Sequence, residues 1–159
     1  MTVPGVVSRK PLSSEGPTDR SSKVACLTAY DYPTARLLDE AGVGLLLVVN
    51  SLGMAVMGHD NTLAVTLEEM LHHLRAVRQG ARRALVVTDM PYGSSHVSIE
   101  ESLRNARRLV KEVGAGAVKV EGRERRIELI ARLVDAEIPV MGHVGLTPQS
   151  VHALGGFYA

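Results

Sequence analysis

The sequence is poor in several features on which common functional classes depend. Its 159 residues contain no tryptophan, only four tyrosines and one phenylalanine, and a single cysteine, Cys26. One cysteine excludes an internal disulfide framework and a cysteine-rich zinc site. The longest apolar run, residues 45–49, is far too short to cross a bilayer. The first residues also lack the basic start, apolar stretch and cleavage site of a secretory signal, so we expect a cytoplasmic protein.

An excess of charge of one sign is also missing. The chain has 18 basic and 17 acidic residues and a net charge of +1. Nucleic-acid binding usually needs a basic surface and often aromatic stacking, so we expect no nucleic-acid partner. The apolar fraction of 45% and the charged fraction of 22% are typical of a globular protein. The length suits one domain, but it is well below the ~250 residues of a complete (β/α)₈ barrel.

The chain divides into two parts of different composition. Residues 1–22 hold three prolines and several glycines, serines and threonines without a sustained hydrophobic period. This composition predicts a flexible N-terminal arm. Residues 23–159 alternate short apolar runs with longer segments of helical period, which predicts the folded domain.

The apolar runs are nearly continuous, as is typical of parallel strands covered on both faces. We expect strands at 24–28, 45–49, 84–87, 117–120 and 138–141. We expect helices at 33–41, 66–79, 98–113 and 124–136, and the start of another near Pro148. Thr66 and Glu69 predict a capping box. Gly42, Gly80 and Gly114 are expected to be left-handed residues that end helices. This alternation predicts a parallel α/β sheet, and it fits both an open doubly wound sheet and part of a closed barrel.

Polar side chains follow each expected strand. These residues are Tyr30, Asp31, Asn50, Ser51, Asp89, Lys119, Glu121 and His143. The carboxyl ends of parallel strands meet at one edge of the sheet, where ligands bind. Polar residues also follow strands simply because loops are polar. Four successive strands that each deliver an ionisable or amide group favour a site.

The residue types at these strand ends indicate a magnesium site, because oxygen ligands without cysteine favour Mg²⁺ over zinc. Asp89 and Glu121 could hold the ion, and a 2-oxo acid could chelate it and form a metal-stabilised enolate. Lys119 could neutralise the substrate carboxylate, and His143 could donate a hydrogen bond or move a proton. Lys119 and Glu121 share one face of a strand. Their spacing also fits an ordinary salt-bridged pair.

Six blocks of the sequence, in order, resemble ketopantoate hydroxymethyltransferases. The blocks are Leu27–Tyr32, Asn50–Met54, Gly58–Thr62, Thr88–Gly93, Ala117–Gly122 and Gly142–Ser150. The resemblance implies a TIM barrel of the phosphoenolpyruvate/pyruvate superfamily type, of which the chain would hold about five of eight βα units. It implies transfer of a hydroxymethyl group from 5,10-methylenetetrahydrofolate to 3-methyl-2-oxobutanoate in pantothenate synthesis, with Mg²⁺. It also implies a cytoplasmic homo-oligomer, commonly a decamer.

The resemblance assigns roles to residues by position. Asp89 and Glu121 match the family's metal-site acids. Ser51 and Lys119 match substrate-binding residues, and Asp89 also lies close to the substrate in the family. His143 matches an active-site histidine.

The sequence departs from the family pattern at several of these positions. Asn50 stands where the pattern has a metal-binding and substrate-binding aspartate, and its amide offers an oxygen but no charge. Val49 and Arg123 replace glycines. The family's general base, a glutamate, is expected to lie beyond Ala159.

Three hypotheses follow from the resemblance and its departures. The chain is part of a ketopantoate hydroxymethyltransferase, or it is a truncated remnant or assembly partner without catalytic activity. A third hypothesis, another magnesium-dependent lyase of the superfamily, lacks support from the block Gly142–Ser150. We expect the 159-residue chain alone not to release product.

Overall fold

The computed structural model describes residues 24–122 and 124–156. The predicted arm 1–22 and the glycine replacement at Arg123 lie outside these residues. The strands are β1 Cys26–Thr28, β2 Leu45–Val48, β3 Leu85–Asp89, β4 Ala117–Glu121 and β5 Val140–His143. The α-helices are α1 Tyr32–Glu40, α2 Leu52–Ala55, α3 Leu67–Gly80, α4 Ile99–Lys111, α5 Ile127–Asp135 and α6 Val151–Leu154. Two 3₁₀ turns, η1 Glu124–Arg126 and η2 Pro148–Ser150, precede α5 and α6.

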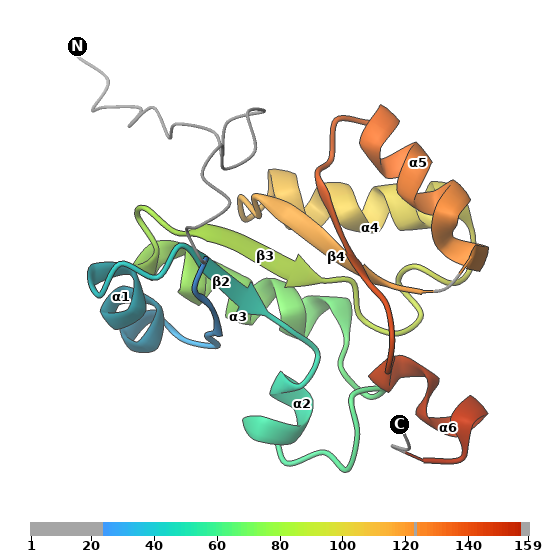
Figure 1. Ribbon diagram of the computed structural model, residues 1–159, viewed down its shortest axis with the longest axis horizontal. Helices are drawn as coiled ribbons and strands as arrows, with labels where there is room; N and C mark the ends of the chain where they lie inside the picture. The colour runs from blue at the N-terminus through green and yellow to red at the C-terminus, as the bar shows by residue number, and fades with distance from the viewer. Residues whose placement is uncertain (1–23, 123, 157–159) are drawn as a thin grey trace.

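The order of the strands decides between the two architectures left open by the sequence. The five strands form one sheet in the order β1-β2-β3-β4-β5, and every neighbouring pair is parallel (Figure 1). A doubly wound sheet reverses its strand order at a switch point, whereas strands of a (β/α) barrel follow one another in sequence. The sheet therefore has the topology of a barrel, and the described residues form five of its βα units.

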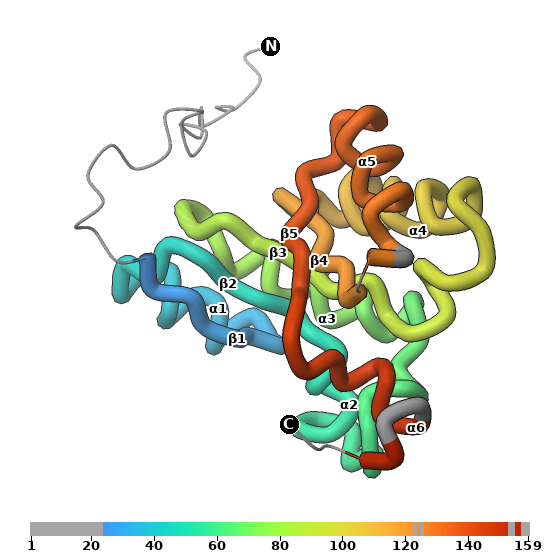
Figure 2. Tube along the Cα trace, turned by 45° about the vertical axis from the view of Figure 1, so that its right-hand side comes forward, coloured from blue at the N-terminus to red at the C-terminus, as the bar shows by residue number. Residues whose placement is uncertain are grey.

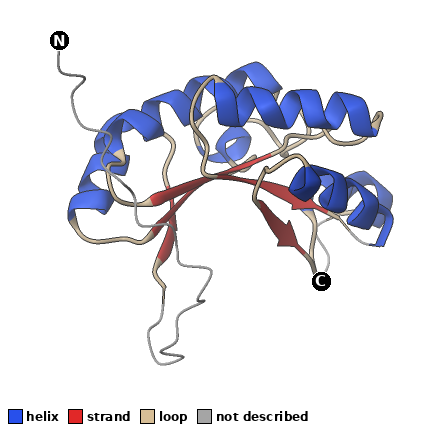
Figure 3. Ribbon diagram, turned by 90° about the horizontal axis from the view of Figure 1, so that it is seen from above, coloured by secondary structure: helices blue, strands red, loops and turns tan. Residues whose placement is uncertain are grey.

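The two faces of β2 differ in burial. Leu46, Val48 and Val86 face the helices and are fully buried. Leu45 and Leu47 face the other way and are only partly buried. Figure 3 shows the long helices along one side of the strands. The partly buried face is the one that would line the interior of a closed barrel.

The expected signals at the ends of helices are largely confirmed. The Thr66 hydroxyl accepts a hydrogen bond from the Glu69 N–H at 3.2 Å, and the Glu69 carboxylate accepts one from the Thr66 N–H at 2.8 Å. Gly42 and Gly114 are left-handed, with φ of 88° and 83°.

Gly80 differs from the expectation, because it is the last residue of α3 and is not left-handed. A Cβ there would lie 2.6 Å from the Tyr32 carbonyl oxygen and 2.9 Å from the Ala35 Cβ. Gly80 therefore allows α1 and α3 to approach closely, which a pattern of helix ends does not reveal.

The strands extend further toward the polar residues than the apolar runs predict. β3 ends at Asp89, β4 at Glu121 and β5 at His143. These three side chains thus belong to the last residues of strands, so the ladder fixes their backbone positions. The expected helix 124–136 begins as η1 and becomes α-helical only at Ile127.

The described helices are all too short or too polar to cross a membrane. Figure 1 and Figure 2 show α2 and α6 at the same end of the molecule, where the chain leaves β2 and β5. This end is the carboxyl edge of the strands, called the rim below.

Candidate functional site

The register of the sheet brings four predicted residues together at the rim. Asp89 pairs with Lys119 on the neighbouring strand, and Glu121 pairs with His143. Paired residues of neighbouring strands project to the same face, and so do residues two apart on one strand. The convergence predicted from the sequence is therefore confirmed for these four residues, which we call the rim cluster.

A lysine lies between two buried carboxylates in the rim cluster. The Lys119 Nζ is 2.6 Å from Asp89 Oδ1 and 4.0 Å from Glu121 Oε1. The two carboxylate side chains are only 3% and 5% exposed. Removing such charges from water is costly, and their attraction offsets this cost only when the remaining polar atoms also find partners.

The second oxygen of Asp89 is held by the backbone of the next strand end. The Asn50 N–H donates to Asp89 Oδ2 at 2.9 Å. Burial raises the pKa of the Asp89 carboxyl, although the Lys119 ammonium and the Asn50 N–H act in the opposite direction. A buried carboxyl with a raised pKa next to a specific charged partner is typical of a functional site.

Glu121 is held by a residue to which the sequence assigned no role. The Gln149 N–H donates to Glu121 Oε2 at 3.1 Å, and the Gln149 side-chain amide donates to the Met90 carbonyl at 3.0 Å. Gln149 lies in η2, which begins at Pro148, and N–H groups in the first turn of a helix are free to bind anions. Gln149 belongs to the family motif Gly142–Ser150, but the sequence gives no sign of its contact with Glu121.

Several polar atoms near the rim cluster are buried without a hydrogen-bond partner in the structure. They are Asn50 Oδ1, Asn50 Nδ2, Gln149 Oε1 and His143 Nδ1. The His143 Nδ1 lies 3.4 Å from Glu121 Oε1, but the atoms are not aligned for a hydrogen bond. An unpaired buried polar group costs about 1–3 kcal/mol, so an accumulation of them at one place indicates room for a ligand.

The first two strand ends contribute less directly. The Tyr30 hydroxyl and the Ser51 Oγ form a hydrogen bond of 2.8 Å, so Ser51 is held by a tyrosine that the sequence left without a role. The Asp31 carboxylate accepts from the Thr34 N–H at 2.8 Å and caps α1. Asp31 is therefore a structural residue, whereas Ser51 lies directly after Asn50 at the rim.

The donor set at the rim can be tested for its fit to a metal ion. Residues 24–122 and 124–156 contain no group of three His, Cys, Asp or Glu side chains that could hold an ion. Magnesium does not need such a cage, because it is usually bound by one or two carboxylates, with waters and substrate oxygens completing the octahedron. Asp89, Glu121 and the unpaired Asn50 Oδ1 supply only oxygens. The residues present fit magnesium.

Comparisons of the sequence with known proteins point to one family. The family model described as ketopantoate hydroxymethyltransferase matches residues 15–159. A 3-methyl-2-oxobutanoate hydroxymethyltransferase of Koribacter versatilis (strain Ellin345) is 57% identical over 152 residues, which are 94% of this chain and 52% of the relative. The corresponding protein of Syntrophomonas wolfei is 52% identical over 138 residues, 87% of this chain and 50% of the relative. The chain thus spans about half the length of these curated relatives.

Solved structures resemble the fold at low sequence identity. A phosphonopyruvate hydrolase complexed with oxalate and Mg²⁺ superposes with a TM-score of 0.62 at 16% identity, covering 83% of this chain and 50% of that one. A 2,3-dimethylmalate lyase of the PEP mutase/isocitrate lyase superfamily gives 0.60 at 18% identity, covering 76% and 48%. These likenesses confirm the expected barrel type and extend no further than the fold.

Proposed function

Since the chain belongs to the ketopantoate hydroxymethyltransferase family, we propose that its rim binds 3-methyl-2-oxobutanoate together with Mg²⁺ for hydroxymethyl transfer from 5,10-methylenetetrahydrofolate. The observation that carries the proposal is the rim cluster itself. It joins two buried carboxylates and one lysine, and the unpaired amide of Asn50 lies beside them. A cytoplasmic location and a homo-oligomeric state remain predictions that accompany this proposal.

We propose that Lys119 binds the carboxylate of the substrate. Lys119 is 12% exposed and can turn its ammonium from Asp89 to the carboxylate of the oxo acid. A fixed positive charge at the carboxylate end would then orient the substrate at the rim. Ser51 directly follows Asn50 in the chain, and its hydroxyl is held by Tyr30. This hydroxyl can donate a hydrogen bond to the substrate.

Asp89, Glu121 and the Asn50 side-chain oxygen would hold the metal ion. Magnesium, when bound, would supply Lewis acidity that favours loss of a proton from the carbon beside the ketone. Asn50 supplies an oxygen without charge, so the ion would be bound more weakly than by an aspartate at this position.

His143 is the described residue that we propose to hold or move a proton. Its Nδ1 is buried and unpaired beside Glu121, and the side chain is 28% exposed. The two ring nitrogens of histidine can accept and donate a proton, which suits exchange of a proton with a ligand. The main base expected from the family is a glutamate that does not correspond to a described residue.

One observation favours a second candidate function, a family member that binds without turnover. Asn50 removes a negative charge at the rim, and its amide has no hydrogen-bond partner in the structure. Such a chain would retain the fold and part of the ligand site. It would act as a remnant or an assembly partner of complete enzymes.

Calorimetric titration of the purified chain with 3-methyl-2-oxobutanoate, in the presence and absence of Mg²⁺, tests the proposal. We expect binding that requires Mg²⁺ and is lost with 3-methylbutanoate, which lacks the keto oxygen. Lys119→Met should weaken binding at least about tenfold, because ion-paired hydrogen bonds contribute about 1.5–3 kcal/mol. Lys111→Met, at an exposed lysine of α4, is the matched control.

The wild-type result with the two acids stands even if Lys119→Met unfolds. Equal binding of both acids would contradict the proposal. Mass spectrometry after addition of 5,10-methylenetetrahydrofolate then separates the two candidates. Formation of 2-dehydropantoate supports the transferase, and binding without product supports the non-catalytic form.

A further inference from the structure

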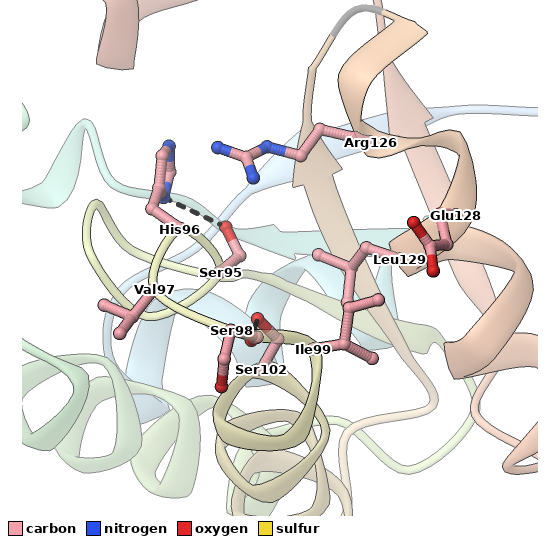
Figure 4. A pocket seen from close by; sticks show the side chains of 9 residues that line it. All are labelled: Ser95, His96, Val97, Ser98, Ile99, Ser102, Arg126, Glu128 and Leu129. Carbon is pink, nitrogen blue, oxygen red and sulfur yellow. Dashed lines mark hydrogen bonds between the residues drawn. The ribbon is translucent and has the colours of Figure 1, made fainter.

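A pocket lies among the segments that follow β3 and β4, and none of its lining residues belongs to the rim cluster. It has a volume of about 170 Å³ and lies between the loop after β3 and the start of α5 (Figure 4). One wall comes from residues 95–99 and the other from residues 126–129. These segments follow the strands that end in Asp89 and Glu121.

Arg126 brings a positive charge to the pocket. Arg126 forms no ion pair within 4.0 Å among the described residues, and in Figure 4 its guanidinium points toward His96. Burial and the charge of Arg126 both lower the pKa of His96. Arg126 is thus close enough to disfavour a second positive charge, and an anion between the two side chains would relieve this.

The first turn of α4 forms part of the pocket wall. Ser98 caps this 13-residue helix by accepting the Glu101 N–H at 3.1 Å, and both Ser98 and Ile99 line the pocket. The partial positive charge of the helix N-terminus is offset by Glu100 and Glu101 in the same turn. Arg126 is therefore the group of this pocket that can pair with an anion.

The remaining lining residues limit the kind of anion. Glu128 brings a carboxylate that can accept an N–H, and it would repel a simple polyanion. Ile99 and Leu129 offer an apolar surface. The combination suits a carboxylate next to an amide N–H and a short methylene chain, as in an N-acylated amino acid.

We propose that this pocket binds the glutamate tail of the folate cosubstrate. Arg126 pairs with a tail carboxylate, for which the guanidinium fork is well shaped. Glu128 accepts the amide N–H, and Ile99 and Leu129 contact the methylene groups. The identity of the ligand rests on the proposed function, whereas the chemistry of the pocket rests on these residues.

The experiment compares two probes that differ only in the tail. Binding of p-aminobenzoylglutamate and of p-aminobenzoate to the full chain is measured by calorimetry or NMR. Wild type should bind the glutamate-bearing probe at least tenfold more tightly. Arg126→Gln should remove this difference, and Arg126→Lys should retain part of it. Arg104→Gln, at an exposed arginine of α4, should leave it unchanged.

Failure of this inference can be distinguished from failure of the proposed function. Mg²⁺-dependent binding of 3-methyl-2-oxobutanoate is measured on the same variants and should be unchanged in Arg126→Gln. Loss of the oxo-acid signal in wild type, with an intact Arg126-dependent tail effect, would overturn the proposed function only. Equal binding of both probes to wild type, or a tail effect that survives Arg126→Gln, would overturn the pocket assignment.

Discussion

Two buried aspartates lie near opposite ends of β3, and their surroundings differ. Asp39, at the end of α1, accepts hydrogen bonds from the Arg83 and Ala84 N–H groups at 2.8 and 2.7 Å. The Arg83 Nε also lies 3.8 Å from its second oxygen. Asp89, at the carboxyl end, accepts from one N–H and one lysine.

The pKa values of the two carboxyls shift in opposite directions. Burial favours the neutral form of both. At Asp39 the backbone hydrogen bonds and the charge of Arg83 outweigh burial, so the pKa is lowered. At Asp89 burial prevails over Lys119, so the pKa is raised. The fold satisfies Asp39 on its own, whereas the surroundings of Asp89 include unpaired polar atoms of Asn50 and Gln149.

The difference separates a structural carboxylate from the one for which we propose a ligand-binding role, although both are buried and both contact a basic residue. Asp39 ties α1 to the chain entering β3 and needs nothing further. Near Asp89, buried polar atoms of Asn50 and Gln149 have no hydrogen-bond partner in the structure. Substitutions at the two ends of β3 test this separation.

Asp89→Asn should abolish Mg²⁺-dependent binding of the oxo acid. The substitution removes one of the two anionic ligands that we propose for the metal, and we expect a loss of at least about 100-fold, or ~3 kcal/mol. Calorimetry measures the affinity, and Asp135→Asn, at an exposed aspartate of α5, is the control. An affinity of Asp89→Asn for the oxo acid within threefold of the wild-type value would show that Asp89 does not belong to the site.

Asp39→Asn should instead destabilise the fold. An amide keeps the oxygen that accepts from the Arg83 and Ala84 N–H groups, but these bonds lose the carboxylate charge and an NH₂ group then faces the Arg83 guanidinium, which together costs about 2 kcal/mol. Urea denaturation measures this loss, and the affinity for the oxo acid should be unchanged. A variant as stable as wild type would mean that the hydrogen bonds at this end contribute little.

Asn50→Asp should increase the affinity of the rim for Mg²⁺. A third carboxylate supplies charge that the amide lacks, so we expect Mg²⁺ to bind about tenfold more tightly, or ~1.4 kcal/mol. Without metal the variant should be less stable, because Asp89 would face another buried negative charge. Unchanged magnesium affinity would show that residue 50 is not a ligand.

The pH dependence of stability should reveal Asp39. Its folded pKa lies below the unfolded value of about 3.9, so its contribution is complete above that value and is lost as the pH falls through the folded pKa. Urea titrations of wild type and Asp39→Asn between pH 6 and 3 should therefore show a stability difference that narrows only below about pH 4. A difference that is independent of pH would contradict the lowered pKa.

The rim cluster could be predicted from the sequence because its residues lie within or near short apolar runs. Asp89, Glu121 and His143 lie just after apolar runs and Lys119 lies within one, so parallel topology alone brought them together. The contact of Gln149 with Met90 spans 59 residues, and no periodicity links the two positions. Sequence patterns therefore predicted the side chains at the strand ends, but not the contacts of Gln149 in the segment after β5.

The same limit applies at the other end of the sheet. Asp39 lies within an amphipathic helical pattern in which an acidic residue is expected to face solvent, yet its partners are 44 and 45 residues away. The order of the strands also required the structure, because an alternating βα pattern fits an open sheet as well as a barrel. Family motifs predicted the barrel, and the sequential strand order confirmed it.

The most direct test of the central claim is one titration carried out on three proteins side by side. Wild type, Asp39→Asn and Asp89→Asn are titrated with 3-methyl-2-oxobutanoate and Mg²⁺ at a temperature at which all three are folded. Wild type and Asp39→Asn should bind with the same affinity, and Asp89→Asn should show no measurable binding. Equal losses in the two variants, or binding in all three, would contradict the division between a structural and a ligand-binding end of the sheet.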